Sequence, residues 1–100
     1  MMRFKDLDPI LHSQLRLAVV SLLINTEVAE FTYIREQTGA TSGNLSIQIT
    51  KLKEAGYISV TKKFRNNYPQ TLCRITDLGR QEFETYVKNL KDYLDTGQKA

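Results

Sequence analysis

The chain has 100 residues, of which 41% are hydrophobic and 25% are charged, and its net charge is +3. These values predict one globular domain with a single modest core rather than a disordered tail. One cysteine and one histidine are too few for an intramolecular disulfide or for the usual protein-only zinc site. The richest apolar stretch, residues 15–24, is too short to span a bilayer, and the N-terminal MMRFKDLDP lacks an apolar signal region. We therefore expect a cytoplasmic protein without a membrane partner.

The positive charge is concentrated in the middle third of the chain. Residues 41–75 carry six basic side chains and one acidic side chain, whereas residues 1–40 and 76–100 each carry four basic and five acidic ones. Localised positive charge is typical of proteins that bind a polyanion, although a solvated basic surface would have the same composition.

Apolar residues at helical spacing predict a first helix of about four turns that opens at Asp8-Pro9. Asp8 can accept hydrogen bonds from the free amides at the helix start, and proline suits the first helical position. The apolar stripe of this helix is expected to face the core. His12 is expected to be structural or exposed, because no nucleophile lies near it in the sequence.

Two shorter helices follow. A polar loop with a possible short strand at residues 29–31 precedes a helix over residues 33–38, which Thr32 is expected to cap. Gly39 is expected to end that helix in a left-handed conformation.

After a tight turn, Thr41 or Ser42 is expected to cap a third helix of about residues 42–55, which stops at Gly56. Two helices joined by a turn of this length are a helix-turn-helix.

The rest of the chain predicts a hairpin and a long last helix. Alternating side chains from Tyr57 to Phe64 indicate a strand with one wet face, and a turn-rich loop over residues 65–70 leads to a return strand over residues 71–75. Thr76 then caps a helix that reaches about residue 95. The fold expected for residues 1–100 is mainly α with a small β-hairpin (α+β), in the order helix, short strand, helix, helix, strand, strand, helix. This single domain is a winged helix-turn-helix.

At 100° per residue, the third helix divides into an apolar arc and a polar arc. Leu45, Ile49 and Leu52 are expected to face the core. Asn44 and Ser46, outside that arc, could meet base edges or phosphates, and the exposed Ile47 could contact a thymine methyl. The rest of the polar arc and its flanks consists of Gly43, Thr50, Lys51 and Glu54. An ordinary amphipathic helix with a wet outer face would show the same pattern.

Three basic residues of the hairpin, Lys62, Lys63 and Arg65, are candidates for phosphate contacts. The alternative is a charged strand edge that prevents aggregation, and both roles are compatible.

The segments LDPILHSQLRLAVVSLL, GNLSIQITKLKEAGYI and PQTLCRITDLGRQEFETY resemble small prokaryotic winged-helix transcriptional regulators related to the MarR and ArsR types, of the compact one-domain kind. The resemblance implies sequence-specific binding of double-stranded DNA as a homodimer. The helix at about 42–55 would lie in the major groove, and the basic wing, residues 58–75, would lie on the phosphate backbone. The residues expected to contact DNA are Thr41, Ser42, Gly43, Asn44, Ser46, Ile47, Thr50, Lys51, Lys62, Lys63 and Arg65.

Two features depart from the family pattern. Relatives often carry a basic or histidine residue where this chain has Ile47 or Gln48, and their wing tip is usually more basic than residues 67–70, which are neutral here. The expected phosphate contacts therefore move to the lysines and arginine that precede the tip. Metal-sensing relatives use clusters of cysteine, histidine and carboxylate side chains that this sequence lacks, so we expect no metal site.

The last helix carries more apolar side chains than a 100-residue monomer readily covers, which favours a two-fold dimer with reading helices about one DNA turn apart. The expected interface consists of Leu11, Phe83, Tyr86, Val87, Leu90, Tyr93 and Leu94. Alternatively, the stripe packs wholly on the first helix of its own chain. An interface lined with tyrosines could hold a small-molecule effector, although nothing in the sequence requires one.

Two other function classes compete with DNA binding. A winged helix can serve as a protein-interaction module whose basic face docks an acidic partner. An enzyme is not expected, because the sequence has no paired carboxylates in a plausible cleft, no glycine-rich phosphate loop and no nucleophile beside a base. We therefore expect no catalytic residues and no cofactor. Cys73 is expected to be a buried apolar residue rather than a redox switch.

Overall fold

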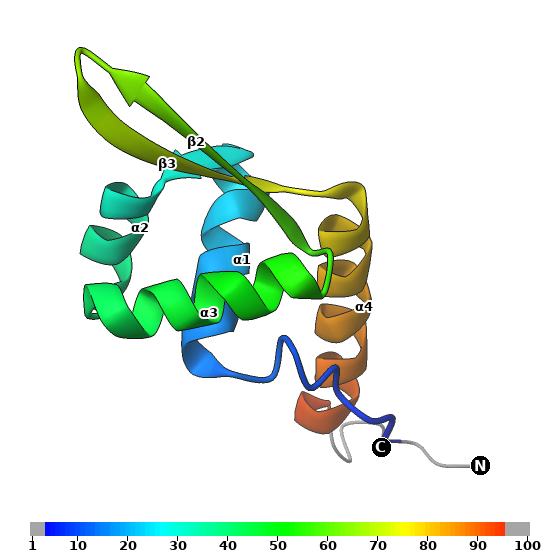
Figure 1. Ribbon diagram of the computed structural model, residues 1–100. Helices are drawn as coiled ribbons and strands as arrows, with labels where there is room; N and C mark the ends of the chain where they lie inside the picture. The colour runs from blue at the N-terminus through cyan, green and yellow to red at the C-terminus, as the bar shows by residue number, and fades with distance from the viewer. Residues whose placement is uncertain (1–3, 96–100) are drawn as a thin grey trace.

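The computed structural model describes residues 4–95 and has the element order expected from the sequence. The elements are α1 (Gln14–Thr26), β1 (Val28–Glu30), α2 (Phe31–Thr38), α3 (Ser42–Glu54), β2 (Ile58–Arg65), β3 (Tyr68–Ile75) and α4 (Asp77–Leu94). In Figure 1, α3 lies across α1, and the hairpin of β2 and β3 projects away from the helices. This arrangement confirms the winged helix-turn-helix fold.

The first helix begins later than the sequence predicts. Its N-cap is Ser13, whose hydroxyl accepts from the backbone N–H of Arg16. Asp8 instead closes a separate turn: its Oδ1 accepts from the backbone N–H of Ile10 at 2.8 Å, and its carbonyl accepts from the N–H of His12 at 2.8 Å. The prediction was wrong because an aspartate can cap a local turn as readily as a helix.

The second helix also differs at its start. It begins at Phe31 with Glu30 as an N-cap that makes no side-chain cap bond, so the prediction of Thr32 as the cap was wrong. The reason is that β1 runs directly into α2, and the extended backbone of Glu30 takes the cap position. Gly39 ends α2 in the left-handed conformation, with φ of 72°, as predicted.

The two later helices begin where the sequence predicts. Thr41 caps α3 by accepting from the N–H of Asn44, and Thr76 caps α4 by accepting from the N–H of Gly79. The backbone of α4 approaches the α3–β2 connection closely at Gly79. A Cβ atom there would lie 2.2 Å from the carbonyl oxygen of Tyr57, so only glycine fits without displacement.

The sheet is antiparallel with the order β1-β3-β2. β1 lies one residue earlier than the short strand expected at residues 29–31, and it pairs only with residues 72–74 of β3. Beyond that point the hairpin is two-stranded.

The hairpin turn is tighter than the predicted loop over residues 65–70. Asn66 and Asn67 both have positive φ, 51° and 68°, which is the pattern of a two-residue type I′ turn. Because asparagine tolerates this conformation, β3 already begins at Tyr68, where it pairs with Arg65.

The core draws on every helix and strand. Its buried side chains are Leu11, Val19, Val20, Leu23, Ala29, Ile34, Leu45, Ile49, Leu52, Tyr57, Ile58, Cys73, Ile75 and Tyr86. Leu45, Ile49 and Leu52 are the apolar arc of α3 predicted from the sequence. Their burial fixes the rotation of α3 about its axis and therefore determines which side chains face outward.

Candidate nucleic-acid interface

The outer side of α3 is open along its whole length. All the residues of α3 and its cap that were expected to contact DNA are exposed: Thr41, Ser42, Gly43, Asn44, Ser46, Ile47, Thr50 and Lys51. Ile47 is 55% exposed. The outer face of α3 is therefore not covered by any other part of residues 4–95.

Gly43 has no role in the packing of the described chain. A Cβ atom at this position would meet nothing within 4 Å. A glycine inside a helix costs up to about 1 kcal/mol relative to alanine. The fold therefore gains nothing from Gly43, whereas a close external partner would benefit from the missing side chain.

The hydroxyl groups at the start of α3 are arranged to donate. Thr41 Oγ1 accepts from the N–H of Asn44 at 3.1 Å, and Ser42 Oγ accepts from Arg35 Nη1 at 3.1 Å. Because each oxygen already accepts a bond, each O–H proton can be donated outward. A helix N-terminus with such donors suits an anionic oxygen.

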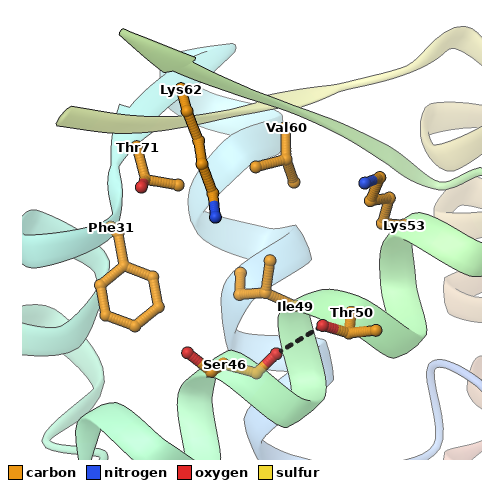
Figure 2. A pocket seen from close by; sticks show the side chains of 8 residues that line it. All are labelled: Phe31, Ser46, Ile49, Thr50, Lys53, Val60, Lys62 and Thr71. Atoms are coloured by element: carbon orange, nitrogen blue, oxygen red, sulfur yellow. Dashed lines mark hydrogen bonds between the residues drawn. The ribbon is translucent and has the colours of Figure 1, made fainter. Parts of the chain in front are cut away.

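A groove of about 260 Å³ separates α3 from the sheet (Figure 2). Lys62 extends from β2 into this groove towards α3, and Lys53 of α3 lines it as well. Its other lining residues are Phe31, Ser46, Ile49, Thr50, Val60 and Thr71. Thr50 Oγ1 donates to the carbonyl of Ser46 at 2.9 Å, so the groove offers two ammonium groups and the hydroxyls of Ser46 and Thr71. These donors fit a run of phosphate oxygens.

The structure separates the three predicted phosphate-binding residues of the hairpin. Lys62 pairs across the ladder with Thr71, and both line the groove beside α3. Lys63 and Arg65 alternate with Lys62 along β2, so their side chains leave the opposite face of the hairpin. Only Lys62 therefore faces the groove, while the other two lie exposed near the tip.

Several side chains that the sequence analysis did not select lie at this interface. Lys53 was missed because it lies next to the core arc on the helical wheel. A lysine at such a position usually packs its stem against apolar surface and keeps its ammonium group in water. Arg35 comes from α2 and reaches α3 only through the fold. Phe64 and Tyr68 are 77% and 75% exposed at the hairpin tip, where the tight turn places them.

Arg74, by contrast, contributes little to the basic surface. It lies at the far end of β3 and forms an exposed ion pair with Glu27, with 3.9 Å between its Nη1 and the carboxylate Oε2. One of the positive charges counted for residues 41–75 is thus offset by an acidic group from outside that segment.

The residues predicted for a dimer interface fall into three groups by exposure. Leu11 and Tyr86 are buried in the core of their own chain, where Tyr86 Oη lies 2.9 Å from His12 Nδ1, so they offer no free surface. Leu94 is 74% exposed, and Tyr93 is partly exposed. Phe83, Val87 and Leu90 are partly buried on α4.

The N-terminal segment covers part of α4. Tyr93 Oη donates to the carbonyl of Lys5 at 2.6 Å, and the Phe4 ring lies 5.0 Å from the Tyr93 ring. Figure 1 shows this segment running past the C-terminal half of α4. The apolar stripe of α4 is therefore covered partly by its own chain, as the alternative interpretation of the sequence allowed.

The described residues carry no metal-binding cluster and no membrane-spanning helix. Residues 4–95 contain no group of three or more histidine, cysteine, aspartate or glutamate side chains able to hold a metal ion. Within the same range, none of the helices combines the length and apolar character needed to cross a membrane. Cys73 is fully buried, as predicted, and burial raises the pKa of its thiol to about 11.

Comparisons with known proteins agree with this geometry. A sequence-family model described as a winged helix DNA-binding domain matches residues 15–94. An uncharacterized protein of Methanocaldococcus jannaschii is 33% identical over 78 residues, which make up 78% of this chain and 85% of that protein.

Two solved structures are also similar. A transcriptional regulator homologue protein from Pyrococcus horikoshii OT3 superposes with a TM-score of 0.82 at 30% identity, over 91% of this chain and 89% of the other. The transcriptional regulator BldR from Sulfolobus solfataricus has a TM-score of 0.70 at 17% identity. The matched region is 83% of this chain and 58% of BldR, and this second likeness concerns the fold alone.

Proposed function

We propose, because this chain belongs to the family of winged-helix DNA-binding domains, that it regulates transcription by binding a specific sequence of double-stranded DNA. The resemblance to small winged-helix regulators expected from the sequence is confirmed by the family match and the fold. In the proposed complex, α3 lies in the major groove and the hairpin lies along a neighbouring phosphate backbone.

One observation carries this proposal: the exposed outer face of α3 continues directly into the groove that Lys53 and Lys62 line. Short side chains on α3 permit close approach to base edges, and the groove supplies positive charge at its side. A surface that only kept the protein soluble would not need both features side by side.

The competing function, a protein-interaction module for an acidic partner, would use the same positive charge. The missing side chain of Gly43, which serves no packing within the described residues, would permit close approach of either kind of partner. The hydroxyl protons that stay free at the start of α3 would suit the carboxylates of such a partner as well as phosphates. We favour DNA over a protein partner because the family model that matches residues 15–94 is that of a DNA-binding domain.

A two-fold dimer is proposed with the exposed end of α4 at its centre. Leu94 and Tyr93 offer apolar surface there, and the partly buried Phe83, Val87 and Leu90 adjoin it on the same helix. Such a dimer would place two copies of α3 on half-sites about one helical turn apart. Sedimentation equilibrium would test it: a molecular mass of one chain at micromolar concentration would contradict the dimer. A small-molecule effector stays a prediction.

Selection of bound sequences from a random DNA pool tests the proposed function. We expect enrichment of a defined sequence, with two related half-sites if the protein binds as a dimer. Binding of the selected duplex should weaken steeply as salt rises, because each phosphate contact releases counterions. The absence of binding even at low salt would contradict the proposal and favour the protein-interaction module.

A further inference from the structure

We propose that Gln48 is a positioning residue that fixes the side-chain amide of Asn44, so that Asn44 presents N–H donors, not its oxygen, to the DNA. This inference rests on the proposed function. It names the chemistry of one contact: the group that Asn44 meets is a hydrogen-bond acceptor.

Arg16 of α1 sets the orientation of the Gln48 amide. Its Nη1 donates to Oε1 of Gln48. A guanidinium has donors and no acceptor, so the oxygen end of the Gln48 amide is the end that must face it. Arg16 cannot turn away easily, because its Nε also donates to the carbonyl of Ile10 at 2.6 Å, and its Nη2 donates to the carbonyl of Pro9 at 3.4 Å.

Gln48 in turn sets the orientation of Asn44, which lies one turn before it on α3. With its oxygen turned to Arg16, Gln48 directs its Nε2 donor to Oδ1 of Asn44 at 3.0 Å. An asparagine oxygen that accepts this bond leaves Nδ2 on the other side of the amide. Nδ2 donates to no other group among residues 4–95, and the side chain of Asn44 is exposed.

The hydrogen bonds of this relay, which consists of Arg16, Gln48 and Asn44, therefore determine the orientation of both side-chain amides. A side-chain amide can be turned by 180° with little change in shape, and only its hydrogen-bond partners decide which end faces outward. Here the donor-only Arg16 decides the orientation of Gln48, and Gln48 decides that of Asn44. The exposed Nδ2 then suits a phosphate oxygen, or base acceptors in the major groove such as guanine O6 and N7, thymine O4 and adenine N7. Asn44 in this orientation disfavours the N4 donor of cytosine.

The variant Gln48→Glu should reverse the orientation of the Asn44 amide while it keeps the hydrogen bond from Arg16. A carboxylate only accepts, so one oxygen accepts from Arg16 and the other can accept only from Nδ2 of Asn44. Asn44 must then turn its oxygen outward. If Asn44 meets a base, the selected sequence should change at one position towards cytosine or the N6 donor of adenine. If Asn44 meets a phosphate, all sequences should lose about tenfold in affinity, because two acceptors would oppose each other.

The added negative charge of Gln48→Glu would itself weaken DNA binding, so a double-mutant cycle with Asn44→Ala separates the two effects. In the Asn44→Ala background only the charge effect remains. We expect Gln48→Glu to weaken binding of the wild-type sequence about tenfold more when Asn44 is present than when it is absent. Equal effects in both backgrounds would overturn the inference.

A measurement without DNA distinguishes this inference from the proposed function. Side-chain amide hydrogens should exchange slowly with water at Nε2 of Gln48 and fast at Nδ2 of Asn44 in the wild type. In Gln48→Glu, Nδ2 of Asn44 should become protected. If this exchange pattern is found but the wild type binds no DNA, the relay exists and the proposed function fails. If the wild type binds DNA but Nδ2 of Asn44 is already protected, the proposed function stands and the inference fails.

Discussion

Replacing Lys62 with alanine should weaken DNA binding and reduce its salt dependence. Lys62 extends into the groove between β2 and α3, where Ser46 supplies a hydroxyl group on the facing wall. A phosphate in this groove would be neutralised by Lys62, and binding it would release about one condensed counterion.

The size of the effect follows from that count. One phosphate contact contributes about −0.9 to the slope of log K against log salt concentration, so a fourfold rise in salt costs about 3.5-fold in affinity per contact. The Lys62→Ala variant should therefore have a slope about 0.9 shallower than the wild type. Lys63→Ala should change the slope less, because the side chain of Lys63 leaves the opposite face of β2.

The assay is a fluorescence anisotropy titration of the selected duplex at several salt concentrations. Lys88→Ala is the matched control, since Lys88 is an exposed lysine on α4 and its removal changes the net charge equally. If Lys88→Ala and Lys62→Ala change the slope equally, the effect reflects total charge and the groove is not a phosphate site. If Lys63→Ala has the larger effect, the backbone runs along the other face of the hairpin.

Three further predictions use substitutions elsewhere in the chain. Gly43→Ala should stabilise the fold by up to about 1 kcal/mol in urea unfolding, because a Cβ there meets nothing within 4 Å, yet weaken DNA binding; unchanged DNA affinity would contradict close approach at this position. Gly79→Ala, the same change in α4, should destabilise the fold by about 2 kcal/mol or more, since its Cβ would lie 2.2 Å from the carbonyl oxygen of Tyr57. Stability should also fall as the pH rises from 9 towards 11, because burial raises the pKa of Cys73 to about 11 from the ordinary 9.0 and the unfolded thiol loses its proton first. Urea unfolding of Cys73→Ala should show a smaller decrease over that pH range, and an equal decrease would mean that other groups cause it.

The parts of the fold that follow from local patterns could be predicted from the sequence. The spacing of Leu45, Ile49 and Leu52 fixed the buried side of α3, and the caps at Thr41 and Thr76 are where hydroxyl side chains precede helical segments. Errors occurred where two local structures compete for one residue type. Asp8 closes a turn instead of starting α1, and Asn66-Asn67 forms a turn of two residues where a longer loop was expected.

The candidate site was predicted less completely because it joins elements that are distant in the sequence. The exposed residues of α3 could be listed from its helical period alone. The groove could not, since Lys53 and Lys62 meet only when β2 folds back over α3. Likewise, the contact between Arg16 and Gln48 spans 32 positions, and no periodicity connects α1 to the outer edge of α3.

The short length of β1 has a mechanical consequence for the hairpin. β1 supports β3 only at residues 72–74, and two paired strands without further packing are only marginally stable. The distal ribbon, from Lys62 to the turn and back to Thr71, can therefore bend at the point where the third strand stops. Small rotations of the ribbon about this point would displace Phe64 and Tyr68 at its tip. In the proposed complex the hairpin could therefore adjust to duplexes of differing groove width while α3 keeps its position in the major groove.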